Sequence, residues 1–233
     1  MDVPSPPADA PPLVVDIDGT LTDESRAVDP RVFPVLHEWP APVVVATGKS
    51  MPYPVALCDF VGIETVVIAE NGGVVLVGRD TLRIEGDRAA ADAVAAAYRE
   101  AGYDLGWGEA DLVNRWRETE VAVSLDSPLE PLADIAAEHG LEVVDTGFAY
   151  HVKSPAITKG TGLEAVAEEL DLAPADFAAV GDSENDAATF ERAGLSIAVA
   201  NADETALAAA EYVTDARYAD GFLEAVERIG TAR

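Results

Sequence analysis

Short, uninterrupted apolar segments alternate with helical stretches along this chain, and this alternation limits the available folds more than any other feature. Residues 13–17, 42–46 and 65–69 are rich in β-branched side chains, and residues 177–180 and 195–199 repeat the pattern later. Strands that are buried on both faces read as continuous apolar runs of this kind. We therefore predict an α/β fold in which a doubly wound, mainly parallel sheet lies between two layers of helices.

The middle of the chain follows a different pattern. Its predicted strands and helices occur in the order β–α–β–α–β–β, with Gly140 in a position that ends the second helix. This order predicts a small inserted α+β unit at residues 81–155, between core segments at residues 13–80 and 156–233. Residues 1–12 contain five prolines, and we predict a disordered tail there.

The charge is strongly acidic, with 43 Asp and Glu against 15 Lys and Arg, and a net charge of −28. One explanation is an acidic disordered chain, but the regular apolar segments argue against disorder. Another is an acidic partner-binding surface, but the acids are spread evenly along the chain and do not form blocks. We favour adaptation to concentrated salt, because at ~1 M salt the Debye length falls to about 3 Å and surface repulsion is screened. A nucleic-acid partner is disfavoured, because so acidic a protein would repel the phosphate backbone.

Cellular location is constrained by cysteine content and hydropathy. Cys58 is the only cysteine, so an internal disulfide is excluded. The N-terminus has no secretory signal pattern, and no apolar run approaches the roughly 20 residues that span a bilayer. We expect a cytoplasmic protein without a membrane partner; the sequence does not indicate its oligomeric state.

Acidic side chains gather where two predicted strands end. Asp16 and Asp18 close the first strand, and residues 181–186 place three acids within five positions after a later one. Paired buried acids are costly unless a cation or hydrogen-bond donors balance them, and Mg²⁺ prefers such oxygen ligands. The alternatives are an Asx-capped turn at Asp16 and Asp18, and simple helix capping at residues 182–186.

Phosphate-binding groups are placed in a similar way. Thr47 and Gly48 follow the second strand, where a hydroxyl and backbone N–H groups can hold phosphate oxygens. Lys159 begins a predicted helix, although lysine favours helix C-termini, and this placement indicates a nearby anion. Helix N-capping near Thr47 and an exposed surface lysine remain the alternatives. In open α/β sheets all these strand ends meet at the ligand-binding edge.

Together, these segments resemble the signature of the haloacid dehalogenase superfamily. The match consists of Asp16-Ile17-Asp18-Gly19-Thr20, then Thr47, then Lys159, then Gly181-Asp182-Ser183-Glu184-Asn185-Asp186, in the order that the superfamily requires. The inserted unit lies where the subgroup of sucrose-phosphate and mannosyl-phosphoglycerate phosphatases has its α+β cap. The short length, the small cap and residues 70–73 look most like the archaeal phosphoglycolate phosphatases. The resemblance implies a Rossmann-like core.

The resemblance also implies an Mg²⁺-dependent phosphatase acting on a small phosphate monoester. Asp16 would be the nucleophile and Asp18 the general acid and base, while the phosphate-binding residues would be Thr47, Gly48, Lys159 and Asn185. The magnesium site would involve Asp16, Asp18 through its backbone carbonyl, Asp182 and Asp186. The implied reaction is hydrolysis of 2-phosphoglycolate. A sugar-phosphate phosphatase, a phosphomutase and a non-catalytic binding protein on the same scaffold are the alternatives.

The predicted cap contains several residues that could select the substrate. Arg115 or Arg117 could pair with a substrate carboxylate, although we favour surface positions for both and a core position for Trp116. His151 is interpreted as structural, and Trp39 as part of the core.

Overall fold

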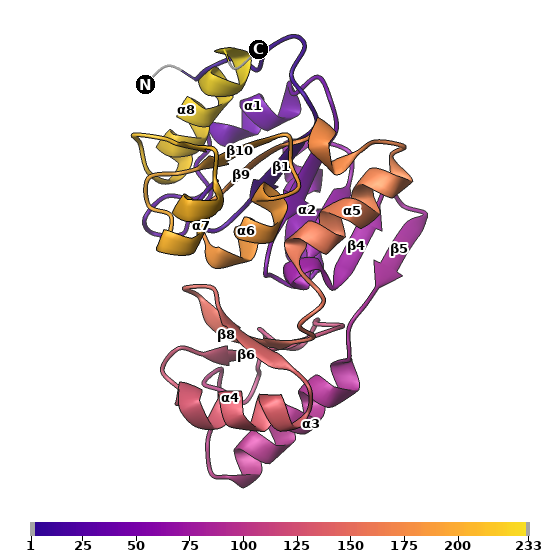
Figure 1. Ribbon diagram of the computed structural model, residues 1–233, viewed down its shortest axis with the longest axis vertical. Helices are drawn as coiled ribbons and strands as arrows, with labels where there is room; N and C mark the ends of the chain where they lie inside the picture. The colour runs from indigo at the N-terminus through magenta and orange to yellow at the C-terminus, as the bar shows by residue number, and fades with distance from the viewer. Residues whose placement is uncertain (1–2, 232–233) are drawn as a thin grey trace.

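The computed structural model describes residues 3–231. Within this range, one sheet of eight strands forms the core and one antiparallel sheet of three strands belongs to a cap, which Figure 1 shows below the core. The core strands are β1 (Leu13–Asp16), β2 (Val43–Ala46), β3 (Val66–Ala69), β4 (Val74–Val77), β5 (Thr81–Ile84), β9 (Ala178–Gly181), β10 (Leu195–Ala198) and β11 (Tyr212–Val213).

The core sheet is mainly parallel, as predicted. Its order is β11-β10-β9-β1-β2-β3-β4-β5; all pairs from β11 to β3 are parallel, whereas β4 pairs antiparallel with both β3 and β5. Strand β5 pairs with β4 along its whole length. Thr81–Ile84 therefore extends the core sheet and lies outside the cap, although the sequence pattern predicts a cap that starts at residue 81.

Two layers of helices cover this sheet. They are α1 (Val32–His37), α2 (Pro52–Val61), α5 (Lys159–Glu169), α6 (Glu184–Phe190), α7 (Glu204–Ala209) and α8 (Tyr218–Thr231). One buried cluster joins the sheet to α1, α2 and α8, and a second joins its other face to α5, α6 and α7. Successive strand residues alternate between the clusters: Leu13 and Val15 lie in the first, and Val14 lies in the second.

The cap has its own sheet and its own apolar core. Its elements are α3 (Arg88–Glu100), β6 (Val121–Ser124), α4 (Leu129–Glu138), β7 (Glu142–Asp145) and β8 (Ala149–Lys153). The cap sheet has the order β6-β8-β7, and its strands face the core while α3 and α4 cover the outer side (Figure 1). Val94, Tyr98 and Leu132 of these helices are buried together with Val123 of β6.

Part of the predicted N-terminal tail packs against the core. Ala10 is buried, and the indole Nε1 of Trp39 donates a hydrogen bond of 2.8 Å to the carbonyl of Pro11. Trp39 is itself buried, in agreement with its predicted core position. The segment from Ala10 onward is thus ordered by the core, while residues 1–2 of the predicted tail lie outside the described range. None of the helices in residues 3–231 has the length and apolar character needed to cross a membrane.

Candidate active site

The strand register brings the polar motifs to one edge of the core sheet. Asp16 at the end of β1 pairs with Ala46 at the end of β2, and β1 also lies beside β9, which ends at Gly181. Thr47 and Asp182 directly follow β2 and β9. All three strands are parallel, so their carboxyl ends, and the polar residues that follow them, meet at the same edge.

Alternation along β1 directs Asp16 toward the helix that begins with Lys159. Asp16 is two residues after Val14, and Val14 packs on the face covered by α5 and α6. The Nζ atom of Lys159 lies 2.6 Å from Oδ1 of Asp16 and 2.7 Å from Oδ1 of Asp186. Lys159 is completely buried, so its charge depends on these two carboxylates. The predicted anion near this helix N-terminus is therefore supplied in part by the protein itself.

The start of α6 is organised by Asp186. Its Oδ2 atom accepts hydrogen bonds from the backbone N–H of Asp182 at 3.0 Å and of Ser183 at 3.1 Å. Both carboxylate oxygens of Asp186 are thus engaged, one by Lys159 and one by this loop. Asp182 has weaker partners, at 3.4 Å from the hydroxyl of Thr20 and 3.3 Å from the amide of Asn201. Asp182 therefore has more capacity than Asp186 to accept a further ligand.

Two residues near Asp182 fix the loop after β1. Gly19 has φ +85°, and a Cβ atom there would lie 2.0 Å from Oδ2 of Asp182, so only glycine fits. The Nδ2 atom of Asn201 donates to the carbonyl of Gly19 at 3.0 Å as well as to Asp182. Sequence reasoning missed Asn201; its position just after β10, at the same sheet edge, was the available signal.

Two acids of this cluster, Asp16 and Asp182, have raised pKa values. Burial raises the pKa of Asp16 to about 7; the Lys159 charge opposes this rise, and repulsion from Asp186 and Asp18 adds to it. Burial, together with repulsion from Asp16 and Asp186, raises the pKa of Asp182 to about 9. Asp16 and Asp186 raise the pKa of Lys159 despite its burial. The single ammonium group of Lys159 therefore does not supply enough positive charge to keep all the surrounding carboxyl groups ionised.

The donor set fits a hard divalent cation. One carboxylate oxygen from each of Asp16, Asp182 and Asp186 lies within 4.8 Å of the others. Oxygen ligands at this spacing suit Mg²⁺, which is bound by few carboxylates and retains water molecules. The carboxylate of Asp18 lies outside this group, so only its backbone carbonyl remains as the contribution that the sequence predicted.

A cavity beside Asp16 collects most of the predicted site residues. It is lined by Asp18, Thr47, Gly48 and Asn185 from the core, and also by Lys49 and Ser183. The cap contributes Thr146, Phe148 and His151 to its wall. The remaining predicted residues, Lys159, Asp182 and Asp186, lie next to Asp16. The structure therefore brings all the predicted site residues to one place. It adds a cap wall that the sequence motifs did not reveal.

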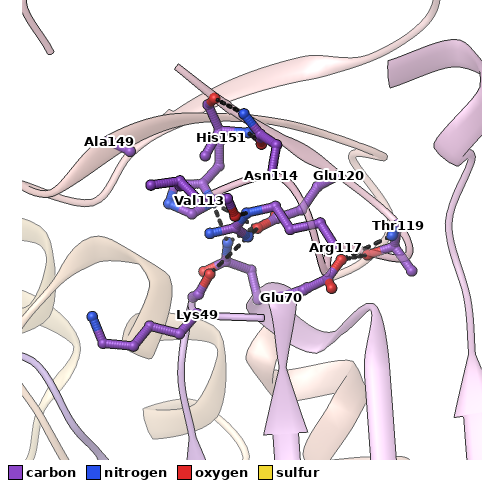
Figure 2. A network of polar contacts seen from close by, with 12 residues as sticks. Lys49, Glu70, Val113, Asn114, Arg117, Thr119, Glu120, Ala149 and His151 are labelled. Atoms are coloured by element: carbon purple, nitrogen blue, oxygen red, sulfur yellow. Dashed lines mark hydrogen bonds and ion pairs between the residues drawn. The ribbon is translucent and has the colours of Figure 1, made fainter. Parts of the chain in front are cut away.

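A second buried polar network joins the cap to this edge of the core (Figure 2). The carboxylate of Glu120 pairs with Arg117, and lies 2.6 Å from Nδ1 of His151 and 3.0 Å from Nδ2 of Asn71. Arg117 also donates to the carbonyl of Gly48 at 2.9 Å. Burial opposes ionisation of Glu120, but attraction to His151 and to Arg117, with the hydrogen bonds from His151 and Asn71, lowers its pKa to about 2.

The turn after β3 connects the two networks. In the 3₁₀ turn Glu70–Gly72, the Oδ1 atom of Asn71 accepts from Nδ2 of Asn185 at 2.9 Å, while its Nδ2 atom reaches Glu120. The carboxylate of Glu70 accepts hydrogen bonds from the backbone N–H groups of Glu118 and Thr119 and from the Thr119 hydroxyl (Figure 2). This turn therefore holds the cap against the loops that line the cavity.

Comparison with known proteins agrees with this geometry. Residues 13–98 and 134–226 match the haloacid dehalogenase-like hydrolase family. The chain belongs to this family. A Haloarcula marismortui protein named phosphoglycolate phosphatase is 67% identical over 94% of this chain and 97% of its own length. Proteins with the same name from Natronomonas pharaonis and Methanococcoides burtonii are 59% and 42% identical, over 93% and 92% of this chain and 96% and 94% of their own lengths.

Solved structures share the fold of this haloacid dehalogenase-like hydrolase. A Thermoplasma acidophilum protein superposes with a TM-score of 0.82 at 21% identity, covering 94% of this chain and 98% of its own. A haloacid dehalogenase-like hydrolase from Bacteroides thetaiotaomicron gives a TM-score of 0.75 at 19% identity, covering 95% and 100%. Core and cap therefore occur together in other members of this fold.

The cap predictions for this hydrolase need two corrections. Arg117, predicted at the surface, is 6% exposed because Glu120 and the Gly48 carbonyl hold it inside the cap–core interface. Trp116, predicted in the core, is 44% exposed, and Arg115 lies over its ring. Arg115 is exposed, as predicted. His151 is buried and bonded to Glu120, yet it also lines the cavity, so it contacts the site as well as the cap core.

Proposed function

We propose that this hydrolase converts 2-phosphoglycolate to glycolate and inorganic phosphate through a phosphorylated Asp16. One observation carries the proposal: Asp16 lies at a cavity that also contains Asp18 and Thr47, and it contacts Lys159. A nucleophile, an acid and phosphate-binding groups therefore face one small space. The names of the relatives supply the substrate, since several of them, including the 67% identical protein, are called phosphoglycolate phosphatase.

The first step transfers the phosphoryl group to the protein. A carboxylate oxygen of Asp16 attacks phosphorus in line, and the bond between phosphorus and the glycolate oxygen breaks. The bonding electron pair leaves with that oxygen, which takes a proton from the carboxyl group of Asp18. The phosphoryl oxygens are held by Thr47, the Gly48 loop, Lys159 and Asn185.

The second step returns Asp16 to its starting form. The carboxylate of Asp18 takes a proton from a water molecule, whose oxygen attacks phosphorus. The bond between phosphorus and Asp16 breaks, and phosphate is released. An acid at position 18 suits both directions of this proton transfer, which is why the site favours a phosphatase.

The cation in this proposal is Mg²⁺, held by the carboxylates of Asp16 and Asp182 and by the backbone carbonyl of Asp18. When bound, it supplies positive charge to the phosphoryl oxygens and to the acid cluster. Because both oxygens of Asp186 already have partners, Asp186 holds Lys159 and the loop of Asp182 in place.

The composition supports a cytoplasmic location and a small-molecule partner. Cys58 is buried, and burial raises the pKa of its thiol to about 11, so this cysteine is unreactive. The net charge of −28 would repel nucleic acid. It would also repel a dianionic substrate, which makes Lys159 and the cation necessary at the site.

The test measures phosphate release from a panel of small phosphate esters in molar KCl, with Mg²⁺ and with EDTA. We expect 2-phosphoglycolate to have the highest kcat/KM, and EDTA to abolish the release. Faster phosphate release from a sugar phosphate would show that the substrate is a sugar phosphate, and it would leave the proposed mechanism unchanged. Isomerised product without free phosphate would indicate a mutase. No turnover of any ester, with Mg²⁺ bound and the protein folded, would reject an enzymatic function.

A further inference from the structure

A second cavity adjoins the one that contains the nucleophile. It is lined by Lys49, Ser50, Tyr53, Val113, Arg117 and Phe148. Lys49 and Phe148 also line the cavity of Asp16 and Asp18, so the two spaces share a wall. A substrate whose phosphate lies at Asp16 could therefore extend its leaving group toward Ser50.

Lys49 is placed on the leaving-group side of the nucleophile. Its Nζ atom lies 2.9 Å from Oδ2 of Asp18, and 4.9 Å from the centre of the Phe148 ring. In the proposed mechanism, Asp18 gives its proton to the leaving oxygen, so the leaving group must lie next to Asp18. The ammonium group of Lys49 is then within hydrogen-bond distance of the carboxyl group that protonates that oxygen.

Ser50 offers an independent sign of a ligand. Its hydroxyl is buried, and it has no hydrogen-bond partner among the described residues. A buried hydroxyl without a partner costs free energy, which a ligand atom that accepts its proton would recover. Ser50 follows Lys49 directly in the chain and lines the same cavity.

Other cations near the site are already engaged. Lys159 is held by Asp16 and Asp186, and Arg117 by Glu120 and the carbonyl of Gly48. Lys49 differs from them because its partner is the carboxylate that must release its proton to the leaving group. A carboxylate on the substrate could pair with Lys49 in place of Asp18, and Asp18 could then donate its proton to the leaving group.

We propose that Lys49 and Ser50 form a subsite that recognises a carboxylate adjacent to the phosphate ester. Lys49 supplies the charge, Ser50 donates a hydrogen bond, and Phe148 and Tyr53 form the apolar wall around the linking methylene group. This inference rests on the proposed function and adds the residues that select its substrate.

The test compares 2-phosphoglycolate with ethyl phosphate, which has a methyl group in place of the carboxylate. We expect Lys49→Met to lower the ratio of their kcat/KM values at least about 10-fold, mainly through KM for phosphoglycolate. Ser50→Ala should lower the same ratio about 3-fold. It should leave thermal stability unchanged, because no protein hydrogen bond is lost. Arg115→Met, an exposed cap arginine, is the matched control and should leave the ratio as in the wild type.

The outcomes separate the subsite from the reaction itself. A wild-type enzyme that hydrolyses both esters equally well, or a Lys49→Met variant with an unchanged ratio, would overturn the subsite and leave the phosphatase intact. If Lys49→Met fails to fold, Ser50→Ala decides alone: a lowered ratio supports the subsite and an unchanged ratio rejects it. Absence of hydrolysis of either ester by the wild type, with Mg²⁺ present, would instead reject the proposed function.

Discussion

The protein contains two buried charge clusters that behave in opposite ways. In the core, Lys159 pairs with Asp16 and Asp186, and the pKa values of Asp16 and Asp182 are raised to about 7 and about 9. At the cap interface, Glu120 lies between Arg117 and His151, and its pKa is lowered to about 2. Burial opposes ionisation in both places. The difference lies in the ratio of cations to acids.

This ratio separates a site for chemistry from a structural contact. The core cluster has more acid than its lysine can balance, so it stabilises an added cation and keeps one carboxylate available to react. In the cap cluster Glu120 has Arg117 as its own counter-charge and His151 and Asn71 as further partners, so this carboxylate is satisfied and the arrangement resists change. Polar burial alone would not have distinguished the two.

Removing the nucleophile should give the largest effect. Asp16→Asn should lower phosphate release at least about 10⁴-fold, because the amide cannot attack phosphorus. The fold should persist, since the amide oxygen can still accept from Lys159. Steady-state kinetics and circular dichroism in molar KCl measure the two quantities, with the exposed Asp59→Asn as control. A variant that retains a tenth of the activity would show that Asp16 is not the nucleophile.

Breaking the cap cluster should act on stability more than on chemistry. Glu120→Gln should lower the free energy of unfolding by about 3–5 kcal/mol, because Arg117 is left buried without its counter-charge. The matched control is Glu168→Gln, which removes an exposed partner of Arg83 and should leave the unfolding midpoint unchanged. Equal effects of the two substitutions in denaturant unfolding would mean that the cap cluster is no more than a surface pair.

The pH dependence of the stability lost in Glu120→Gln tests whether the buried ion pair causes that loss. The pKa of Glu120 falls from 4.5 to about 2 on folding, so its stabilisation is complete above pH 4.5 and is lost as pH falls toward 2. We expect the gap in unfolding free energy between wild type and Glu120→Gln to shrink by about 3 kcal/mol over this range, since one pKa unit equals ~1.4 kcal/mol. A gap that stays constant below pH 4 would exclude the ion pair as its source.

The core cluster was accessible from the sequence because each of its residues follows a strand or begins a helix. Asp16, Thr47, Asp182 and Lys159 occupy such positions, and parallel strands bring their carboxyl ends together without further information. The fold class followed from the same alternation. The limits of the cap could not be predicted in this way. Strand β5 has a sequence pattern like that of the strands before it, and the sequence does not show which sheet it joins.

The cap cluster was not accessible, because its contacts depend on tertiary packing. Asn71 meets Glu120 and His151 across 49 and 80 residues of chain, and Arg117 meets Gly48 across 69. Nothing in the local pattern around Arg117 distinguishes an arginine that packs against the core from one in water. The exposed Trp116 illustrates the reverse case, since its apolar side chain was expected inside.

The smallest effect should come from the residue that joins the two clusters. Asn71 has φ +56° and binds both Asn185 and Glu120, so Asn71→Gly keeps the backbone unstrained and removes only the side chain. We expect kcat to fall about 10-fold, because Asn185 loses the partner that orients it beside the phosphate. Asp171→Gly is the control, since this exposed residue has the same φ and lies outside the site.

Kinetics of Asn71→Gly combined with Glu120→Gln then show whether the clusters act together. If the effects of the two substitutions on kcat simply multiply, the clusters are neighbours without coupling; a smaller combined loss means that Asn71 transmits the position of the cap to the phosphate site.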